Sequence, residues 1–424
     1  MIFNKKDYTE IFRSNNYANV SVDVGYGFVK LAYQTGGSTK NAMQTFSFPS
    51  TVEYDAVSKD EERFLINGVN CVRNSGKKIG QRSTGVATKM NNHNKANFIN
   101  ALYKAYELTG KTHFNVSIGA TTDIYSKSAE KYLDFMRGTG EYKIVSGNKD
   151  EVTLTIMYME VRPEALSGLL SFPGIDSKKR YWIVDIGSGT NHIVKYENGK
   201  ADYGKMPFKN GYIRLTEDLA YNLTQETGNQ FTDTDADWIL RNESERYKEV
   251  IDRTLKDEFL GEVIMTDIKN AGVDLERDCL IFVGGTSHRL KEYIPSVFGQ
   301  YDEKGKLRED LLKIATDGFF ANAIGMLRRL RYEIDTKIAD INAKKIFELN
   351  KTKEALEANK EKAIVVLGKF NDKYSSASNE EEKQEIMNSI EKAKDKLKTI
   401  ELNLKETIED LSASIKLQKM VRPQ

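Results

Sequence analysis

Two short glycine-containing turns, far apart in the chain, share one spelling, and this repetition constrains the fold more than any other feature. The first is VDVGYGFVK at 22–30, and the second is VDIGSGTNH at 184–192. In each, an Asp ends an apolar run, two glycines follow, and another strand-like run begins. Each turn therefore predicts the tip of a β-hairpin, with φ above zero at the glycines and room for a ligand to approach the backbone.

A single turn of this kind has an ordinary explanation, because a tight hairpin with a surface Asp looks the same. The second copy lies about one domain length downstream, which indicates an internal duplication. Two related domains that face each other would bring both tips to one cleft. Bare backbone amides at such tips bind phosphate, and Asp23 and Asp185 would flank a hydrated Mg²⁺.

A third glycine site lies in the segment CLIFVGGTSHRLKEYI at 279–294. Leu280–Val283 reads as a short buried strand and 288–294 as a helix, so Gly284 and Gly285 lie at the junction between them. Alone, such a junction more often reflects packing than ligand binding. After two phosphate-type hairpins, it predicts the place where a nucleoside lies against the backbone at a helix N-terminus.

The composition limits the class of protein. A chain of 424 residues can form two or three domains, each with its own core, and a net charge of +1 indicates no polyanionic partner. The two cysteines, Cys71 and Cys279, offer no disulfide framework and fit a reducing compartment. No apolar run approaches the ~18 residues of a membrane span, and the first residues lack the apolar core of a signal peptide. We therefore expect a cytoplasmic chain without a membrane partner.

The order of the three glycine sites resembles the actin, Hsp70 and sugar-kinase ATPase superfamily. His192 falls where actin carries a His beyond its second phosphate loop. The segments VRPEALSGLL at 161–170 and FFANAIGMLRRL at 319–330 are similar to the bacterial plasmid-partitioning actins of the ParM type. The first turn is most similar to actin itself, whose first phosphate loop it matches at Asp23, Gly25, Gly27, Val29 and Lys30.

The resemblance covers roughly residues 18 to 335 and implies an α/β fold of the duplicated actin/Hsp70 ATPase type. Two domains would flank a nucleotide cleft. Domain I would span 18–160, with a basic outer subdomain at about 50–100. Domain II would span 161–335, with a final helix that returns to domain I, and 336–424 would form a helical coiled-coil extension.

The same resemblance implies roles for individual residues. Asp23 and Asp185 would position Mg²⁺ through water, and Lys30 would reach the phosphate oxygens. The two turns would hold the β- and γ-phosphates of ATP or GTP, and the third site would clamp the nucleoside. The residues of these three sites are Gly25, Tyr26, Gly27, Phe28, Gly187, Ser188, Gly189, Thr190, Gly284, Gly285, Thr286 and Ser287.

Glu164 matches the family's Glu or Gln beside a proline, and it would orient the attacking water, with or without His192. With Asp185, these are the catalytic candidates, since γ-phosphate hydrolysis needs positioning and charge neutralisation more than a strong base. For Glu164 and His192, structural explanations stay open. Glu164 follows Pro163 and would suit the first turn of a helix, and His192 would suit a structural position on a strand.

The segment AYELTGKT at 105–112 has a loose Walker A spelling, but its context is reversed. A P-loop follows a strand and precedes a helix. Here the pattern predicts a helix that ends at Gly110, a natural C-cap, and a strand after it. We therefore reject the motif.

The stretch from Arg63 to Tyr106 has no acidic residue, and its glycine-rich middle reads as a loop. It would form the outer subdomain of an actin-like molecule, as a solvated loop, a filament contact or a docking site for an acidic partner. The acidic run TDTDADW at 232–238 is either a complement to it or ordinary helix capping. The basic residues of the stretch are Arg63, Arg73, Lys77, Lys78, Arg82, Lys89, Lys95 and Lys104.

Beyond about residue 335 the chain becomes densely and evenly charged, with Gly368 as its single glycine. Spacings of three and four predict two long helices, separated by a polar break at 371–379 and folded as an antiparallel hairpin within one subunit or paired between subunits. The second helix has the more regular seam: Ile390, Ala393, Leu397, Ile400, Leu404, Thr407 and Leu411. The less regular first seam comprises Ile338, Ile341, Ile346, Leu349, Leu356, Ala363, Leu367 and Phe370.

This extension favours a filament-forming ATPase or GTPase of the actin type over an Hsp70 chaperone, which would continue into a β-rich domain. The chain would polymerise with itself and segregate plasmid or phage DNA through an adaptor protein, because no basic and aromatic patch indicates direct DNA reading. Two alternatives are a small-molecule kinase or phosphatase of the same fold, and a non-polymerising regulatory ATPase that acts through its coiled coil.

Overall fold

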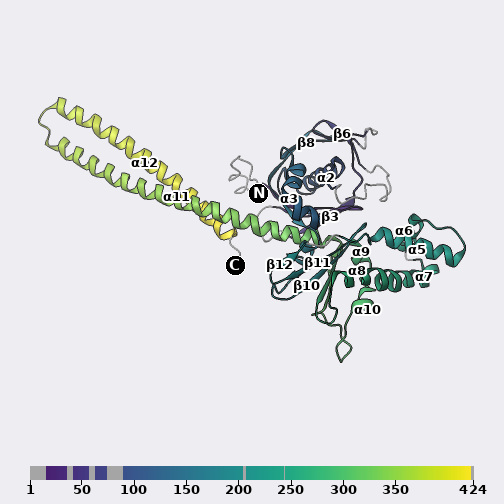
Figure 1. The fold of residues 1–424 in the computed structure, drawn as a ribbon. Helices are drawn as coiled ribbons and strands as arrows, with labels where there is room; N and C mark the ends of the chain where they lie inside the picture. Colours follow the sequence, from purple (N-terminus) through teal and green to yellow (C-terminus); the bar gives the residue numbers. More distant parts are fainter. Residues whose placement is uncertain are drawn as a thin grey trace. The chain divides into compact units, whose positions relative to one another are not determined.

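The computed structural model describes residues 16–35, 42–56, 63–73, 89–203, 207–242 and 244–421. The chain divides into two compact units, Met1–Arg331 and Tyr332–Gln424 (Figure 1). The first unit holds two β-sheets with their helices, and the second is helical.

The strands all belong to the first unit. They are β1 (Ala18–Val24), β2 (Phe28–Thr35), β3 (Gln44–Pro49), β4 (Glu53–Tyr54), β5 (Arg63–Ile66), β6 (Val69–Val72), β7 (His113–Ala120), β8 (Glu141–Ser146), β9 (Val152–Pro163), β10 (Tyr181–Ile186), β11 (Asn191–Glu197), β12 (Lys200–Asp202), β13 (Cys279–Val283) and β14 (Leu312–Ile314).

The helices vary in length from a single turn to the long C-terminal pair. They are α2 (Asn92–Thr109), α3 (Thr122–Arg137), α4 (Leu166–Leu169), α5 (Tyr212–Thr227), α6 (Asp233–Arg241), α7 (Lys248–Asp252), α8 (Met265–Ala271), α9 (Gly285–Arg289), α10 (Ile294–Phe298), α11 (Ala321–Ser376) and α12 (Glu380–Val421), with a π-helical stretch η5 (Arg253–Ile264) and 3₁₀ turns η4 (Glu245–Tyr247) and η6 (Gly318–Phe320).

The two sheets of the first unit repeat one topology. The larger sheet contains the order β3-β2-β1-β7-β9 and the smaller sheet the order β12-β11-β10-β13-β14. In both, the first three strands are antiparallel, and the next two join in parallel. The larger sheet continues through β8, β5, β6 and β4. This repetition confirms the predicted duplicated α/β fold.

Strand alternation gives β10 two different faces, because successive side chains point to opposite sides of a sheet. Trp182, Val184 and Ile186 pack in the core with Phe259 of η5 and its neighbours. Tyr181 and Ile183 pack in a second core with residues of α4 and with Ala321. The buried Trp182 also donates a hydrogen bond from Nε1 to Asp278 Oδ2 at 2.7 Å. Asp185 therefore belongs, by alternation, to the face of Ile183.

The central strand β1 of the larger sheet is buried along its whole length. Val20, Val22 and Val24 lie in the hydrophobic core to which α2 and α3 contribute. Ser21 points the other way and donates from Oγ to the carbonyl oxygen of Ala323 at 2.6 Å. The beginning of α11 thus contacts β1 on the face that also carries Asp23.

The helix predicted in place of a Walker A motif is present. Asn91 caps the N-terminus of α2, and Gly110 ends the helix with a left-handed φ of 66°. Strand β7 follows at once. The order is helix and then strand, so the rejection of the P-loop is confirmed. Likewise, the acidic run at 232–238 begins α6, where Thr232 and Asp235 form a capping box.

The helix predicted over 288–294 is wrong in its position. Helix α9 begins at Gly285 and ends at Arg289, and a separate short helix, α10, begins at Ile294 with Pro295 in its first turn. The early start follows from Gly284, whose φ of 95° turns the chain from β13 directly into the helix. A proline at the first turn of the next helix marks the second start.

In the second unit, α12 pairs with α11 as the predicted antiparallel hairpin. Lys360 pairs with Glu401 at 2.9 Å, and the buried Asn342 donates to the carbonyl oxygen of Ser414, so partners run in opposite directions along the two helices. The break between the helices is Ala377–Asn379, inside the polar segment predicted for it. The second helix buries its predicted seam most fully at Ile390, Ile400 and Leu411.

One member of the first seam was predicted wrongly. Ile341 is 45% exposed, whereas its neighbour Asn342 is buried. Asn342 also bonds Gln418 Oε1 at 3.0 Å, so a polar side chain occupies the seam position there. A buried Asn of this kind fixes the register of paired helices. The first seam looked irregular because some of its members are polar.

Part of the predicted basic stretch lies outside the described residues, namely Lys77, Lys78 and Arg82. Of the described members, Arg73 packs over the ring of Phe64 and bonds Ser146, and Lys104 pairs with Glu107. Both are structural contacts of the larger sheet and of α2. No helix within the described ranges is long and apolar enough to span a membrane.

Candidate functional site

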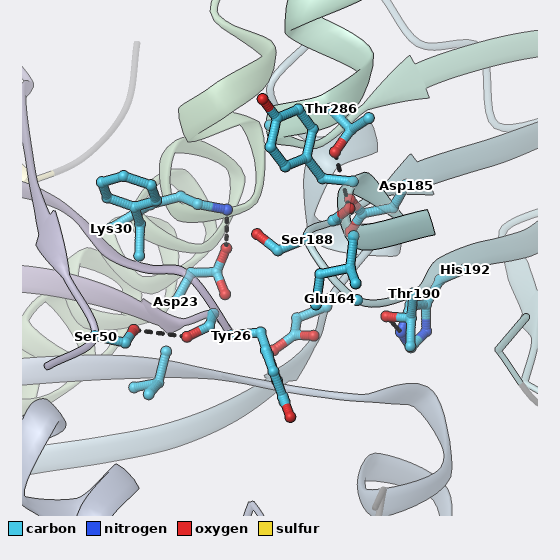
Figure 2. Close-up of a pocket in the computed structure, with 18 of the residues that line it drawn as sticks. Asp23, Tyr26, Lys30, Ser50, Glu164, Asp185, Ser188, Thr190, His192 and Thr286 are labelled. Atoms are coloured by element: carbon cyan, nitrogen blue, oxygen red, sulfur yellow. Dashed lines mark hydrogen bonds and ion pairs between the residues drawn. The ribbon is translucent and has the colours of Figure 1, made fainter. Parts of the chain in front are cut away.

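A cavity of 1390 Å³ lies in the first unit, and residues of both repeated hairpins line it (Figure 2). The first turn contributes Asp23, Gly25, Tyr26, Phe28 and Lys30 to its wall. The second turn contributes Asp185, Gly187, Ser188, Gly189, Thr190 and His192. The two copies of one sequence motif thus face one space, as the duplication predicted.

The two turns have the same backbone geometry. Gly25 N–H donates to the carbonyl oxygen of Phe28 at 3.1 Å, and Gly187 N–H donates to that of Thr190 at 2.8 Å. The flanking strands share a register, because Asp23 pairs with Lys30 and Asp185 pairs with His192. The duplication therefore extends to single residue positions.

The glycines serve close approach and not a left-handed backbone. The predicted φ above zero is wrong for Gly25, Gly187 and Gly189, none of which has a φ in that region. A Cβ at Gly25 would lie 2.7 Å from the carbonyl oxygen of Phe28, and one at Gly187 would lie 3.4 Å from that of Thr190. Each turn is too tight for a side chain at its first glycine.

The first turn carries an ion pair. Lys30 Nζ lies 3.2 Å from Asp23 Oδ2, and both side chains are largely buried. Burial lowers the pKa of Lys30, but the carboxylates of Asp23 and Asp185 outweigh it, so that the pKa is raised. The ammonium also lies 5.1 Å from the ring centroid of Phe319. Lys30 is therefore a charged cation at the cavity wall. Figure 2 shows its contact with Asp23.

Asp185 is held from two sides. Its Oδ2 accepts from Asn322 Nδ2 at 2.8 Å, at the start of α11. Gly284 lies so close that a Cβ there would stand 2.3 Å from Asp185 Oδ1. Gly284 thus leaves room for the carboxylate, and it does not line the cavity itself, nor do Gly27 and Ser287. Gly285 and Thr286 do line it.

The second turn is braced by the N-terminus of α5. Tyr212 N–H donates to the carbonyl oxygen of Gly187 at 3.0 Å, and Ile213 N–H donates to that of Ser188 at 2.9 Å. Gly211 allows this contact, since a Cβ there would lie 2.6 Å from Thr190 N. Thr286 Oγ1 is a second donor to the carbonyl oxygen of Gly187, at 2.8 Å. The carbonyls of this turn are therefore occupied before any ligand binds.

The first turn is braced differently. Ser50, after β3, donates from Oγ to the carbonyl oxygen of Gly25 at 2.7 Å and from N–H to that of Gly27 at 3.0 Å. Ser50 alone thus bonds the carbonyl oxygens of the first turn, whereas the start of α5 and Thr286 together bond those of the second turn. In both turns the bound carbonyls leave backbone amides as the groups available to an anion.

Glu164 follows β9 and lies at the cavity wall, 8% exposed. It is not in a helical first turn, because α4 begins at Leu166. Between them, Ala165 has φ 61° and ψ −64°, and Leu166 N–H donates to the carbonyl oxygen of Glu164. This is a γ-turn of the rare positive-φ kind, a strained conformation of the type that clusters at functional sites.

The Glu164 side chain makes an ion pair with Lys89, which also lines the cavity. Burial raises the pKa of Glu164 to about 7; Lys89 opposes this shift, and the carboxylates of Asp23 and Asp185 reinforce it. A carboxyl group with such a pKa gains and loses its proton near neutral pH, as a group that positions reacting water can do.

His192 lies on β11 opposite Asp185, and one ring nitrogen lies 3.1 Å from Thr190 Oγ1. Burial lowers its pKa, so the neutral imidazole is favoured. Within the described part of the chain, its Nδ1 has no hydrogen-bond partner, and the same holds for Oγ1 of the buried Thr121 at the cavity wall. Buried polar atoms without partners mark a place where a polar ligand or water fits.

A charged network lines another part of the wall. Tyr212 OH donates to Asp237 Oδ1 at 2.7 Å, and Arg289 Nη1 donates to the Tyr212 oxygen at 2.8 Å. Arg241 completes it with a bond to Asp237 at 3.0 Å. These residues come from α5, α6 and α9, next to the predicted nucleoside site.

Several residues of the site were not predicted from the sequence, because their signals are weak. Ser50 lies in an FPS segment, and Asn210-Gly211 looks like an ordinary turn. Asn210 in fact donates to the buried Asp267 of α8 at 2.9 Å, and so does Asn191 at 3.0 Å. Through Asp267, this network joins the residue after the second turn to the segment just before α5, which braces the turn. Only the fold brings these distant residues together.

The donor set suits a hydrated cation. Asp23 and Asp185 present carboxylate oxygens, the ligands that Mg²⁺ prefers, and Mg²⁺ usually keeps several waters and takes the rest of its shell from phosphate. Within the described ranges, no group of three or more His, Cys, Asp or Glu residues could hold a metal by themselves. A metal here would therefore share its shell with water and ligand.

Comparison with known proteins agrees with this geometry. Residues 21–166 match the family model for the N-terminal domain of actin-like proteins. Solved structures that resemble the chain cover about three quarters of it and almost all of their own length. The fold is actin-like.

Three solved structures illustrate the likeness. The archaeal actin homologue Ta0583 has 16% sequence identity and a TM-score of 0.56, over 74% of this chain and 98% of its own. ParM of Bacillus thuringiensis, determined with ATP, has 15% identity and a TM-score of 0.54, over 75% of this chain and 99% of its own. The Alp12 filament structure has 19% identity and a TM-score of 0.52, over 75% and 99%. Among curated proteins, none matches the chain.

Proposed function

We propose that the protein is a nucleotide-driven, filament-forming actin-like NTPase that segregates plasmid or phage DNA through an adaptor protein. The observation that carries this proposal is the pair of matched hairpin turns that face one cavity, each with a buried Asp at its base. The actin-like relatives determined with ATP and as a filament support it. Cys71 and Cys279 are both free and buried, which suits action in the reducing cytoplasm.

The residues of the cavity divide the work of phosphate hydrolysis. The amides of the two turns hold the β- and γ-phosphates of ATP or GTP, and Lys30 neutralises a phosphate oxygen. Asp23 and Asp185 would hold Mg²⁺ through water, and the ion would supply further positive charge at the phosphates. Glu164 orients the attacking water, and the neutral His192 accepts or donates a hydrogen bond beside it.

Residues of both hairpins line the cavity, and this explains how a nucleotide would drive assembly. A phosphate chain held by both turns links the two sheets and favours one arrangement of them. A filament contact that fits this arrangement forms only when nucleotide is bound. Hydrolysis removes one of the anchors, and the filament is then released.

Sedimentation tests the proposal directly. At tens of micromolar protein, a typical range for such contacts, Mg²⁺ with ATP or GTP should bring most of the protein into the pellet, and a chelator should return it to the supernatant. A chain that binds nucleotide but never pellets, with ATP, GTP or non-hydrolysable analogues, is a kinase or regulatory ATPase instead.

Glu164→Ala tests whether Glu164 orients the attacking water. This variant should bind nucleotide and pellet normally, but release phosphate about 100-fold more slowly, because the water is no longer positioned. Its filaments should outlive those of the wild type. Unchanged phosphate release would leave Glu164 with a structural role only.

A further inference from the structure

Lys89 was expected to lie in a basic surface loop, but it lies in the cavity wall and pairs with Glu164. Its side chain is only 19% exposed. Its backbone is held at the start of α2, where Asn94 Nδ2 donates to the Lys89 carbonyl oxygen at 3.3 Å. Asn91 caps the same helix by accepting from Asn94 N–H at 2.8 Å. Lys89 is therefore placed by the beginning of a well-packed helix.

The Lys89–Glu164 ion pair differs from the Lys30–Asp23 ion pair in the carboxylate that it occupies. Lys30 already has the carboxylate of Asp23 as its partner and the ring of Phe319 beside it. Lys89 has the one carboxylate that the reaction needs free. As long as Lys89 pairs with Glu164, it occupies an oxygen that would otherwise accept a bond from water.

We propose that Lys89 senses the γ-phosphate, exchanging the carboxylate of Glu164 for a phosphate oxygen and so releasing Glu164 to orient the attacking water. This inference rests on the proposed function. It names the regulation of that site: with a nucleoside triphosphate Lys89 turns to the phosphate, and with a diphosphate it stays on Glu164.

The exchange is favourable for physical reasons. A γ-phosphate carries more negative charge than a carboxylate. The side chains of Lys89 and Glu164 are only 19% and 10% exposed, and charge-assisted bonds are strong between groups that are largely buried. The ammonium is a compact point charge on a flexible stem, so it can change partners without moving its backbone. No covalent bond is made or broken when Lys89 changes partners, and no proton needs to move.

The contacts of α2 give the exchange a route to the rest of the site. Further along α2, the buried Asn97 accepts from Val52 N–H at 3.3 Å and donates to its carbonyl oxygen at 3.4 Å. Two residues earlier, Ser50 holds the first turn through Gly25 and Gly27. Lys89, α2 and the first phosphate turn are thus joined by hydrogen bonds, so that the position of Lys89 can bias the turn.

The first experiment measures how well the protein discriminates triphosphate from diphosphate. In Lys89→Gln, the ratio of the Kd for ADP to the Kd for a non-hydrolysable ATP analogue, both with Mg²⁺, should fall about 10-fold relative to wild type, since a site-to-ligand coupling of this kind is typically 5–150-fold. Lys89→Arg should keep most of the ratio. Lys104→Gln, which removes the Lys104–Glu107 pair on the same helix, is the matched control and should not change it.

The second experiment needs no turnover. A double-mutant cycle of Lys89→Gln and Glu164→Gln, read by thermal unfolding, should show coupling between the two residues without nucleotide and with ADP, and should lose it with the triphosphate analogue. Suppose that wild type binds both nucleotides, that Lys89→Gln has the same Kd ratio as wild type, and that the coupling does not change with nucleotide. Lys89 is then not a sensor, although the proposed function stands. If wild type binds neither nucleotide, the proposed function itself fails.

Discussion

The two hairpin turns of the first unit share a backbone and differ in what surrounds it. Each turn is closed by a hydrogen bond from the N–H of its first glycine, Gly25 or Gly187, to the carbonyl oxygen three residues later. Each also has an Asp on the strand that precedes it. Opposite that Asp, however, the first hairpin has Lys30 and the second has His192. Duplication therefore accounts for the geometry of the cavity, and later divergence accounts for its charges.

The difference assigns separate tasks to equivalent positions. Lys30 is kept charged by Asp23 and Asp185, whereas burial favours the neutral form of His192. Under the proposed function, the first turn would thus be the side that neutralises phosphate charge. The second turn, with its carbonyls bonded by α5 and Thr286, is the rigid side that fixes position.

The largest effect should come from Asp185→Ala. Without this carboxylate, the proposed Mg²⁺ would lose one of its two protein anchors, and Asn322 loses its acceptor. Metal clamps are worth several kcal/mol, so we expect Mg²⁺-dependent nucleotide binding to weaken about 10³-fold. Isothermal titration measures this. Asp185→Asn, which keeps the shape, should be nearly as weak; if it binds normally, shape and not charge is what matters at this position.

Lys30→Gln and His192→Gln compare the two equivalent positions directly. Lys30→Gln removes a charged contact to phosphate, which is worth about 1.5–3 kcal/mol, and should weaken nucleotide binding about 10- to 100-fold. His192→Gln should change binding only a few-fold. Equal losses in fluorescence-monitored titrations of both variants would show that the two sides of the cavity do the same work.

Gly211→Ala should damage the second turn alone. The new Cβ would meet the backbone at Thr190, Gly187 and Gly189, none of which can rotate away. Overpacking of this kind costs about 1–3 kcal/mol, which urea unfolding of the first unit should report. Gly368→Ala, in open space on α11, is the control and should stabilise its helix slightly. A neutral Gly211→Ala would mean that α5 does not brace the turn.

The effect of Glu164→Gln should depend on pH in the nucleotide-free protein. The native pKa of about 7 lies above the ordinary 4.5, so ionisation destabilises the folded state as pH rises through this range. The groups that face it are Lys89, which favours ionisation, and Asp23 and Asp185, which oppose it. Relative to wild type, the variant should therefore gain stability between about pH 5 and pH 8, by at most about 3 kcal/mol. Urea unfolding across this range should show the gain, and a difference that does not vary with pH contradicts the assignment.

The smallest effect should come from Ala165→Gly. Ala165 has a φ of 61°, and this strain costs of order 1 kcal/mol for a residue with a Cβ. Glycine removes the strain but adds freedom to the unfolded chain. We expect the free energy of unfolding to rise by no more than about 1 kcal/mol, with nucleotide binding unchanged. A clear loss of stability would show that the methyl group packs too well to be removed.

Much of this cavity could be predicted from the sequence because the chemistry lies in local patterns. Asp23 and Asp185, with the glycines beside them, form a repeated spelling that fixes two strands and a turn each time. With the exception of Gly27, the predicted residues from Asp23 to Lys30 and from Asp185 to His192 do line one cavity, although their roles stay predictions. The hairpin of α11 and α12 could be predicted equally well, because the three-and-four spacing of its apolar residues repeats over many helical turns.

The parts that could not be predicted depend on contacts between distant segments. Gly211 matters because it touches the second turn, and nothing in the dipeptide Asn-Gly reveals this. Lys89 reads as one more basic residue in a loop until the start of α2 places it opposite Glu164. Ala165 looks unremarkable as a residue, and only its backbone angle shows the γ-turn. Tertiary contact, and not local preference, decides these three positions.

The buried Trp182 makes the chain its own optical probe. Its indole is bonded to Asp278 inside the first unit, and the only other tryptophan, Trp238, lies on α6 of the same unit and is 63% exposed. The second unit has no tryptophan and is almost entirely helical in its described part. Tryptophan fluorescence therefore reports only on the first unit, with acrylamide quenching selecting Trp238, while far-ultraviolet circular dichroism is weighted toward the hairpin. The unfolding of each unit can be followed in the intact chain without any label.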